Sequence, residues 1–182
     1  MKNTCTMDAK IGHYFHKATC VVDAVSPRSS SDSTLVPSRD KLKIVYDAYT
    51  QKASRNSKTV VNFLFLHGSG MNRSVWEYYL ADIIDNDSDW SCGKILLIDQ
   101  VNHGDSAVLN KDKLGTIFDW SDGARDVCKI AMDELYPKPA NTINVVVGHS
   151  MGGFQALCCG VLYPGLFQLI ITIEPVVLMK NI

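Results

Sequence analysis

From Thr59 onward, apolar runs of strand length alternate with segments of helix length, and this alternation constrains the fold more than any other feature. Strands that are apolar on both faces are typical of parallel sheets with helices on each side. Repeated strand–helix units of this kind predict an α/β fold with a mostly parallel sheet and helices on both faces. The apolar runs span residues 60–68, 94–100, 143–150 and 169–177, and the helical segments span 75–84, 120–136 and 154–163.

The first 40 residues carry little periodic pattern. Residues 27–40 are rich in Ser and Pro, which predicts a loop or flexible linker, and residues 20–25 could form a short strand. Residues 41–50 alternate apolar and polar side chains, as a half-buried strand does. We therefore expect a poorly patterned segment at 1–40, followed by the folded domain at 41–182.

Charge and hydropathy exclude several classes of partner. The chain has 18 Lys and Arg against 19 Asp and Glu, so it offers no electrostatic footprint for nucleic acid. The most apolar stretch, 166–179, is interrupted by polar residues and a proline, so we expect no transmembrane segment. The N-terminal residues contain no apolar run of signal-peptide length.

No cofactor or metal is expected either. Gly68 and Gly70 begin the nucleotide-binding pattern G-x-G-x-x-G, but Arg73 stands where its third Gly belongs. The six cysteines show neither a metal-ligand spacing nor a disulfide pattern, which favours a reducing compartment.

The pentapeptide from Gly148 to Gly152 fits the pattern G-x-S-x-G. An apolar strand leads into it and an apolar helix leads out, which is the setting that a nucleophile elbow requires. Strand and helix pass so close at such a turn that side chains at Gly148 and Gly152 would collide. Ser150 would lie at the tip in a strained conformation, with its hydroxyl at the carboxyl end of the sheet. Ser150 is therefore the candidate nucleophile.

Two backbone N–H groups are candidates for an oxyanion hole. The N–H of Met151 opens the helix after the elbow, where N–H groups lack intrahelical partners and the helix dipole adds positive charge. The sequence HGSG, residues 67–70, follows the first apolar strand. We expect the N–H of Ser69 to be the second donor, with that of Gly70 as the next choice. One such donor is worth roughly 2.7–4 kcal/mol in catalysis.

We interpret the other polar residues near these motifs as structural. His149 is expected to pack beside the elbow rather than to act as the general base. His67 is expected to hydrogen-bond within its own loop, and His103 to brace a loop near the site. Asp99, at the end of a predicted strand, is expected to have a structural role.

Several segments together resemble the α/β-hydrolase superfamily. They are HGSGM at 67–71, LLIDQVNHGDSA at 96–107, GHSMGG at 148–153 and IEPVV at 173–177. The second is similar to the superfamily element D-x-x-G-H-G-x-S, with Asn102 in place of the usual Gly. The resemblance extends over residues 41–177 and is strongest to the fungal peroxisomal lipases.

This resemblance implies a hydrolase of carboxylic esters that acts on an acyl-ester or lipid small molecule through an acyl-enzyme. It implies that Ser150 attacks the carbonyl while the N–H groups of Met151 and Ser69 bind the oxyanion. It also implies a peroxisomal location, whereas the chain as it stands shows no targeting signal and would be cytoplasmic.

The chain departs from the superfamily pattern after the nucleophile. The superfamily order is Ser, then acid, then His, but every histidine here precedes Ser150. Glu174 is a candidate acid, although we favour a buried strand-end carboxylate hydrogen-bonded to a loop. The last two strands, their helix and the lid are expected to be missing, which leaves 169–175 as an apolar edge.

We therefore expect an N-terminal part of a longer enzyme that is inactive and poorly soluble by itself. The alternative is a non-catalytic α/β-hydrolase-like protein that binds a ligand or a partner. The missing histidine favours that alternative, and the intact elbow and HGSG loop argue against it.

Overall fold

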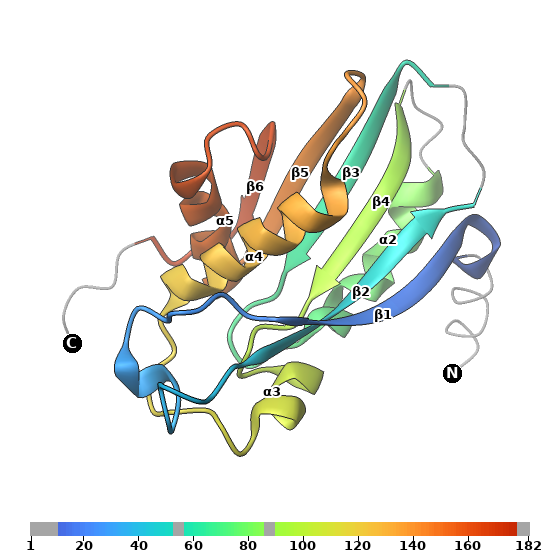
Figure 1. Cartoon of the computed structure of the whole chain (residues 1–182). Coiled ribbons are helices and arrows are strands. Elements are labelled where there is room, and N and C mark those ends of the chain that lie inside the picture. Colours follow the sequence, from blue (N-terminus) through green and yellow to red (C-terminus); the bar gives the residue numbers. More distant parts are fainter. Residues whose placement is uncertain (1–10, 53–56, 86–89, 178–182) are drawn as a thin grey trace.

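Six strands form the sheet on which the rest of the chain is built. In this computed structural model, which describes residues 11–52, 57–85 and 90–177, the strands are β1 (Phe15–Asp23), β2 (Lys43–Gln51), β3 (Thr59–Leu66), β4 (Trp90–Ile98), β5 (Thr142–His149) and β6 (Leu169–Ile173). Their order across the sheet is β1-β2-β4-β3-β5-β6. The strands β4, β3, β5 and β6 are parallel, and β1 and β2 run antiparallel to their neighbours (Figure 1). The expected α/β fold with a mostly parallel sheet is confirmed.

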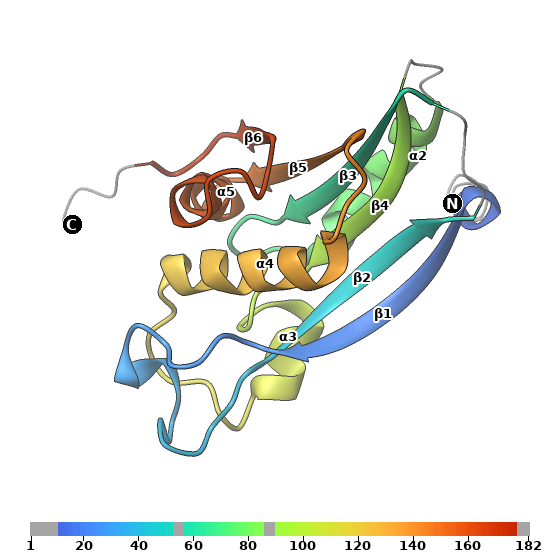
Figure 2. The same ribbon diagram turned by 45° about the horizontal axis from the view of Figure 1, so that its top comes forward.

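Helices cover both faces of this sheet (Figure 2). The helix α2 (Glu77–Asp85), preceded by the 3-10 helix η2 (Arg73–Trp76), lies on one face, and α4 (Trp120–Leu135) and α5 (Met151–Leu162) lie on the other. Side chains alternate along a strand, so an apolar strand such as β3 fills two cores. Its Phe65 packs with Trp76 on the α2 side, whereas Leu64 and Leu66 pack on the side of α4 and α5.

The short helix α3 (Gly104–Asn110) is an element that the sequence pattern did not indicate. Side chain–backbone hydrogen bonds attach it to β2, because Ser106 Oγ accepts the N–H of Val45 and Asn110 donates to the carbonyl of Lys43. Its apolar residues Val108 and Leu109 are exposed. A seven-residue helix held by polar contacts shows no apolar stripe for a periodicity argument to detect.

The segment 27–40 is a loop that contains the 3-10 helix η1 (Ser31–Ser33), and it is attached to α4. Arg28 Nη1 donates to both carboxylate oxygens of Asp126, at 2.9 and 2.8 Å. The backbone N–H and the hydroxyl of Ser29 donate to Asp122, at 2.8 and 2.7 Å. Before this loop, β1 pairs with β2 over nine residues and starts at Phe15, five residues earlier than the strand suggested at 20–25.

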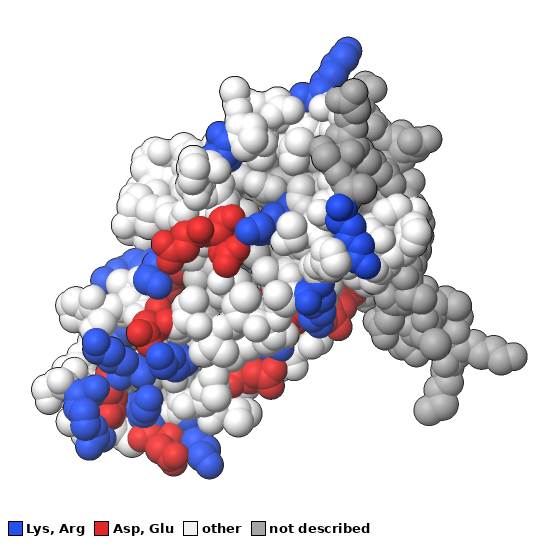
Figure 3. Space-filling model, turned by 45° about the vertical axis from the view of Figure 1, so that its right-hand side comes forward, with Lys and Arg blue, Asp and Glu red and all other residues white. Residues whose placement is uncertain are grey.

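Charged side chains of both signs are interspersed over the face shown in Figure 3. Ion pairs within the described residues include Lys43 with Asp23 and Lys94 with Glu134. Of the helices in the described ranges, none is long and apolar enough to cross a lipid bilayer. The described side chains form no group of three or more His, Cys, Asp or Glu that could hold a metal ion.

Candidate active site

Ser150 forms the turn between β5 and α5. Its backbone has φ 52° and ψ −114°, a conformation that costs energy in a residue with a side chain. The backbone of β6 fixes this turn, because the N–H of Ser150 donates to the carbonyl of Ile173 at 2.9 Å. In the described part of the chain, the half-buried Ser150 hydroxyl has no hydrogen-bond partner, so it is free to meet a ligand.

The two glycines of the elbow lie where strand and helix touch. A Cβ at Gly148 would overlap the backbone carbonyl of Gly152. A Cβ at Gly152 would lie 2.5 Å from the carbonyl oxygen of Leu66 and 2.8 Å from that of His67. Because these are backbone atoms, a larger residue would force α5 away from β3 and β5.

The HGSG loop lies directly against the elbow. A Cβ at Gly68 would lie 2.6 Å from His149 Nδ1 and 3.3 Å from Ser150 Cβ. Neither the N–H of Ser69 nor that of Met151 has an acceptor within residues 11–52, 57–85 and 90–177. The N–H of Gly70, our second choice as a donor, is occupied, since it donates to His103 Nε2 at 3.2 Å.

His67 and His103 hold the loops beside the elbow. His67 is buried, its Nε2 accepts the N–H of Gln100, and its Nδ1 therefore carries the proton that it shares with the carbonyl of Gly68. His103 likewise accepts at Nε2 and donates from Nδ1 to Asn102 Oδ1. Burial lowers the pKa of both rings, which keeps them neutral near pH 7. The expected loop contacts of both histidines are confirmed.

An ion-pair network centred on Arg73 holds the same loops in place. Asp99 is fully buried and accepts the guanidinium and the backbone N–H of Arg73 and the N–H of Asp105. Arg73 also pairs with Asp47 and Asp105, at 2.9 and 2.8 Å. These contacts agree with the structural role expected for Asp99. In the sequence, Arg73 is noticeable only because it stands where a glycine motif requires Gly. Its ion-pair partners lie 26 to 32 positions away, so no local pattern indicates them.

An apolar hollow of about 500 Å³ opens beside the elbow on the α2 side of the sheet. His149 lines it together with Phe65, Met71, Val75, Trp76 and Ile173, among others. The hollow favours an apolar group next to the site, and His149 borders it from the position before Ser150.

Glu174 is placed differently from our expectation. We favoured a buried carboxylate hydrogen-bonded to a loop, but Glu174 is exposed and no described residue hydrogen-bonds to its carboxylate. Its backbone is in the left-handed region, with φ 48°, because the chain turns sharply where β6 ends. This turn directs the side chain outward, and the buried interpretation is wrong.

Residues 63–179 match the profile described as the Alpha/beta hydrolase family. This chain belongs to the alpha/beta-hydrolase family. The family assignment confirms the resemblance that the motifs indicated.

Two relatives show how much of an alpha/beta hydrolase is present. The chain is 52% identical to "Peroxisomal membrane protein LPX1" of Saccharomyces cerevisiae, over 92% of this chain and 44% of that protein. The crystal structure of yeast peroxisomal alpha-beta-hydrolase Lpx1 matches with a TM-score of 0.84 at 51% identity, over 93% of this chain and 47% of that one. The chain thus spans less than half the length of these relatives.

Two proteins with lower sequence identity are also similar to this chain, one in sequence and one in fold. The chain is 28% identical to "Type I acyl-CoA thioesterase mpaH'" of Penicillium brevicompactum, over 78% of this chain and 33% of that protein. A probable hydrolytic enzyme from Pseudomonas aeruginosa PAO1 has the same fold, with a TM-score of 0.60 at 17% identity over 87% of this chain and 42% of that one.

Proposed function

We propose that the site around Ser150 hydrolyses carboxylic esters of acyl groups through an acyl-enzyme. The observation that carries this proposal is the strained elbow, where the Ser150 hydroxyl and the N–H groups of Met151 and Ser69 have no hydrogen-bond partner among the described residues. In the proposed reaction Ser150 Oγ attacks the carbonyl and the two N–H groups donate to the oxyanion. A base passes the Ser150 proton to the alcohol as it leaves, and water then attacks the acyl-enzyme, which releases the acid and returns a proton to Ser150 Oγ.

The hollow and the relatives support the proposed substrate class. Apolar side chains next to the elbow favour an acyl chain over a charged group. The Penicillium relative is named as an acyl-CoA thioesterase, and a thioester carbonyl reacts with the same groups. We propose acyl esters as the substrates, with acyl thioesters as the second class to be tested.

We also propose a peroxisomal location, because the yeast relative is named as a peroxisomal protein.

The general base is the part of the site that these residues do not supply. No histidine within the described ranges hydrogen-bonds to Ser150, and both ring nitrogens of His67 and of His103 have other partners. We therefore propose full activity for a chain of the relatives' length and slow turnover for these 182 residues alone. The same observation favours the second candidate function, a non-catalytic protein that binds a ligand or partner.

Free imidazole separates the two candidates, because it can take the proton that a histidine base would take. The hydrolysis of p-nitrophenyl hexanoate is measured against imidazole concentration for the wild-type chain and for Ser150→Ala. In the presence of imidazole, we expect the hydrolysis rate of the wild-type chain to be at least about tenfold higher than that of Ser150→Ala. This is less than the rate increase of about 10²–10⁴ that a positioned general base gives. A hexanoyl thioester is measured in parallel.

Labelling by a fluorophosphonate completes this test. If Ser150 is competent, the probe labels the wild-type chain faster when imidazole is present and does not label Ser150→Ala. Equal rates in both proteins, with no labelling at any imidazole concentration, would rule out the hydrolase and support the binding protein.

A further inference from the structure

A second hollow, of about 290 Å³, lies where the helices α4 and α5 begin, and we call it the aromatic hollow. It shares no lining residue with the hollow beside His149, which lies on the α2 side of the sheet. Its lining is mostly aromatic and aliphatic, with the side chains of Phe118, Trp120, Phe154, Val176 and Val177.

The first turn of α5 places the aromatic hollow next to Ser150. The N–H of Phe154 donates to the carbonyl of Ser150 at 3.2 Å. Side chains of an α-helix lean toward its N-terminus, so the Phe154 ring lies over the turn that begins at the elbow. The N–H of Val176 donates to the same carbonyl at 3.4 Å, and a Cβ at Gly153 would lie 2.8 Å from that of Pro175. The segment after β6 therefore forms one side of the hollow.

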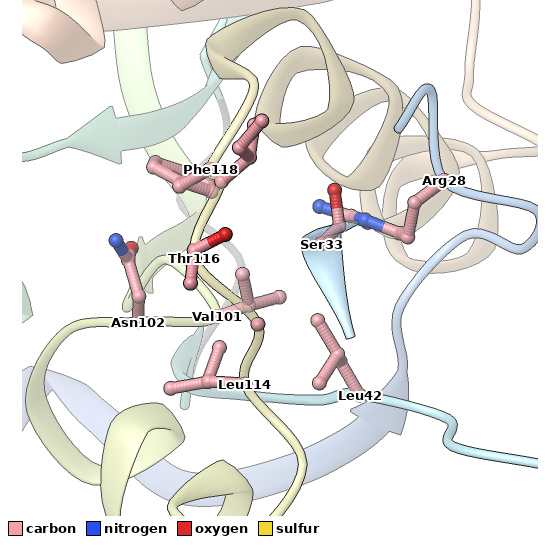
Figure 4. A pocket seen from close by; sticks show the side chains of 10 residues that line it. Arg28, Ser33, Leu42, Val101, Asn102, Leu114, Thr116 and Phe118 are labelled. Atoms are coloured by element: carbon pink, nitrogen blue, oxygen red, sulfur yellow. The ribbon is translucent and has the colours of Figure 1, made fainter. Parts of the chain in front are cut away.

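Phe118 connects the aromatic hollow with the HGSG loop. It lies on the segment that leads into α4, where it also borders a separate cavity of about 120 Å³ (Figure 4). Its ring packs edge to face with His103, with the ring centroids 6.3 Å apart. His103 in turn accepts the N–H of Gly70. Both sides of the aromatic hollow thus contact residues that form or hold the candidate active site.

The rings of Trp120 and Phe154 form a corner within the hollow. Their centroids are 5.8 Å apart and their planes are inclined by 63°. Phe118, Trp120 and Phe154 are all partly exposed, so a group that enters the hollow can reach them. An aromatic ring that packs against such a corner gains edge-to-face contacts in addition to the burial of its surface. The hollow therefore favours an aryl group over an alkyl group of the same size.

Charge in the lining disfavours an anionic occupant. Among the residues that line the aromatic hollow, all of them in the described part of the chain, only Asp119 is charged. Its Oδ1 caps α4, since it accepts the N–H and the hydroxyl of Ser121 at 2.8 and 2.6 Å. A carboxylate or phosphate placed beside Asp119 would meet a like charge. The group that suits this hollow is therefore an uncharged aryl group.

We propose that the aromatic hollow holds the alcohol side of the ester and selects an uncharged aryl group such as benzyl. Trp120 and Phe154 determine the specificity for the alcohol, and the acyl chain lies in the hollow beside His149. The bond between the carbonyl carbon and the benzyl oxygen breaks, and benzyl alcohol leaves with the proton that the base takes from Ser150. This part in the reaction rests on the proposed function, whereas the binding of an aryl group does not.

The hexanoate esters of benzyl alcohol and cyclohexylmethanol test this specificity, because they share the acyl chain and the carbon skeleton of the alcohol. Their hydrolysis by the 182-residue chain is measured with imidazole present, and each kcat/KM is divided by the rate constant for imidazole alone. We expect the benzyl ester to be favoured about fivefold. Trp120→Leu should abolish this preference. The control Tyr163→Leu, which removes an exposed aromatic ring at the other end of α5, should retain it. Melting temperatures verify that both variants fold.

Ligand-observed NMR with the two alcohols tests the aromatic hollow without turnover, in the Ser150→Ala chain. We expect saturable binding of benzyl alcohol, about threefold or more tighter than that of cyclohexylmethanol, and loss of this difference when Trp120→Leu is added. Binding of this kind without hydrolysis would contradict the proposed function and leave the aryl site in place. Hydrolysis with an equal benzyl preference in wild type and Trp120→Leu, or no aryl preference in either measurement, would overturn the aryl site.

Discussion

Arg73 forms ion pairs with carboxylates that differ in their exposure to water. It pairs with Asp99, which is fully buried, and with Asp105, whose side chain is 64% exposed. Water screens the exposed pair, whereas removal of Asp99 costs Arg73 one of its buried carboxylates and leaves Asp47 as the remaining buried partner. We expect Asp99→Asn to lower the free energy of unfolding by about 3 kcal/mol. The matched change Asp105→Asn should lower it by less than about 1 kcal/mol.

Urea denaturation of both variants, followed by tryptophan fluorescence, measures this difference. The comparison is controlled, since the two substitutions remove the same charge from the same arginine. Equal losses of stability would show that burial does not govern the network. A fall in the slope of the transition for Asp99→Asn would instead indicate a change in the compactness of one state.

At the scale of elements, Gly152 and Gly160 of helix α5 differ in what lies closest to them. A Cβ at Gly152 would meet the backbone carbonyls at the end of β3, whereas a Cβ at Gly160 would meet only the flexible end of Ile170. Gly152→Ala is therefore expected to destabilise the fold by about 2 kcal/mol through overpacking. Gly160→Ala should be neutral or stabilise it by up to about 1 kcal/mol, since alanine favours the helix. Thermal unfolding of the two variants tests this, and equal melting temperatures would contradict it.

The elements that could be predicted from the sequence are those with a local signal. The elbow lies between a strand and a helix that adjoin it in sequence, so Ser150 and its glycines could be identified from a few residues. The half-exposed β1 alternates weakly, and its full length becomes clear only from its pairing with β2. The attachment of the loop 27–40 to α4 joins residues 93 to 98 positions apart, which no local pattern encodes.

At the scale of the whole molecule, β6 forms one edge of the described sheet. In the described sheet β6 has only β5 as a neighbour, and Leu169, Ile171 and Ile173 are 49%, 40% and 43% exposed on one of its faces. An unpaired edge that carries exposed apolar side chains promotes pairing between chains. We therefore expect these 182 residues to self-associate at about 100 µM.

Ile171→Lys tests whether β6 causes this association. A lysine in the centre of the strand would place charges next to each other in any edge-to-edge pair, so the fraction of monomer should rise at equal concentration. The control is Val108→Lys on α3, where Val108 is 66% exposed, because it adds the same charge far from the edge. Sedimentation velocity of the three proteins measures the monomer fraction. If Val108→Lys had the same effect, net charge rather than the edge would explain the result, and a monomeric wild-type chain would show that β6 does not pair at all.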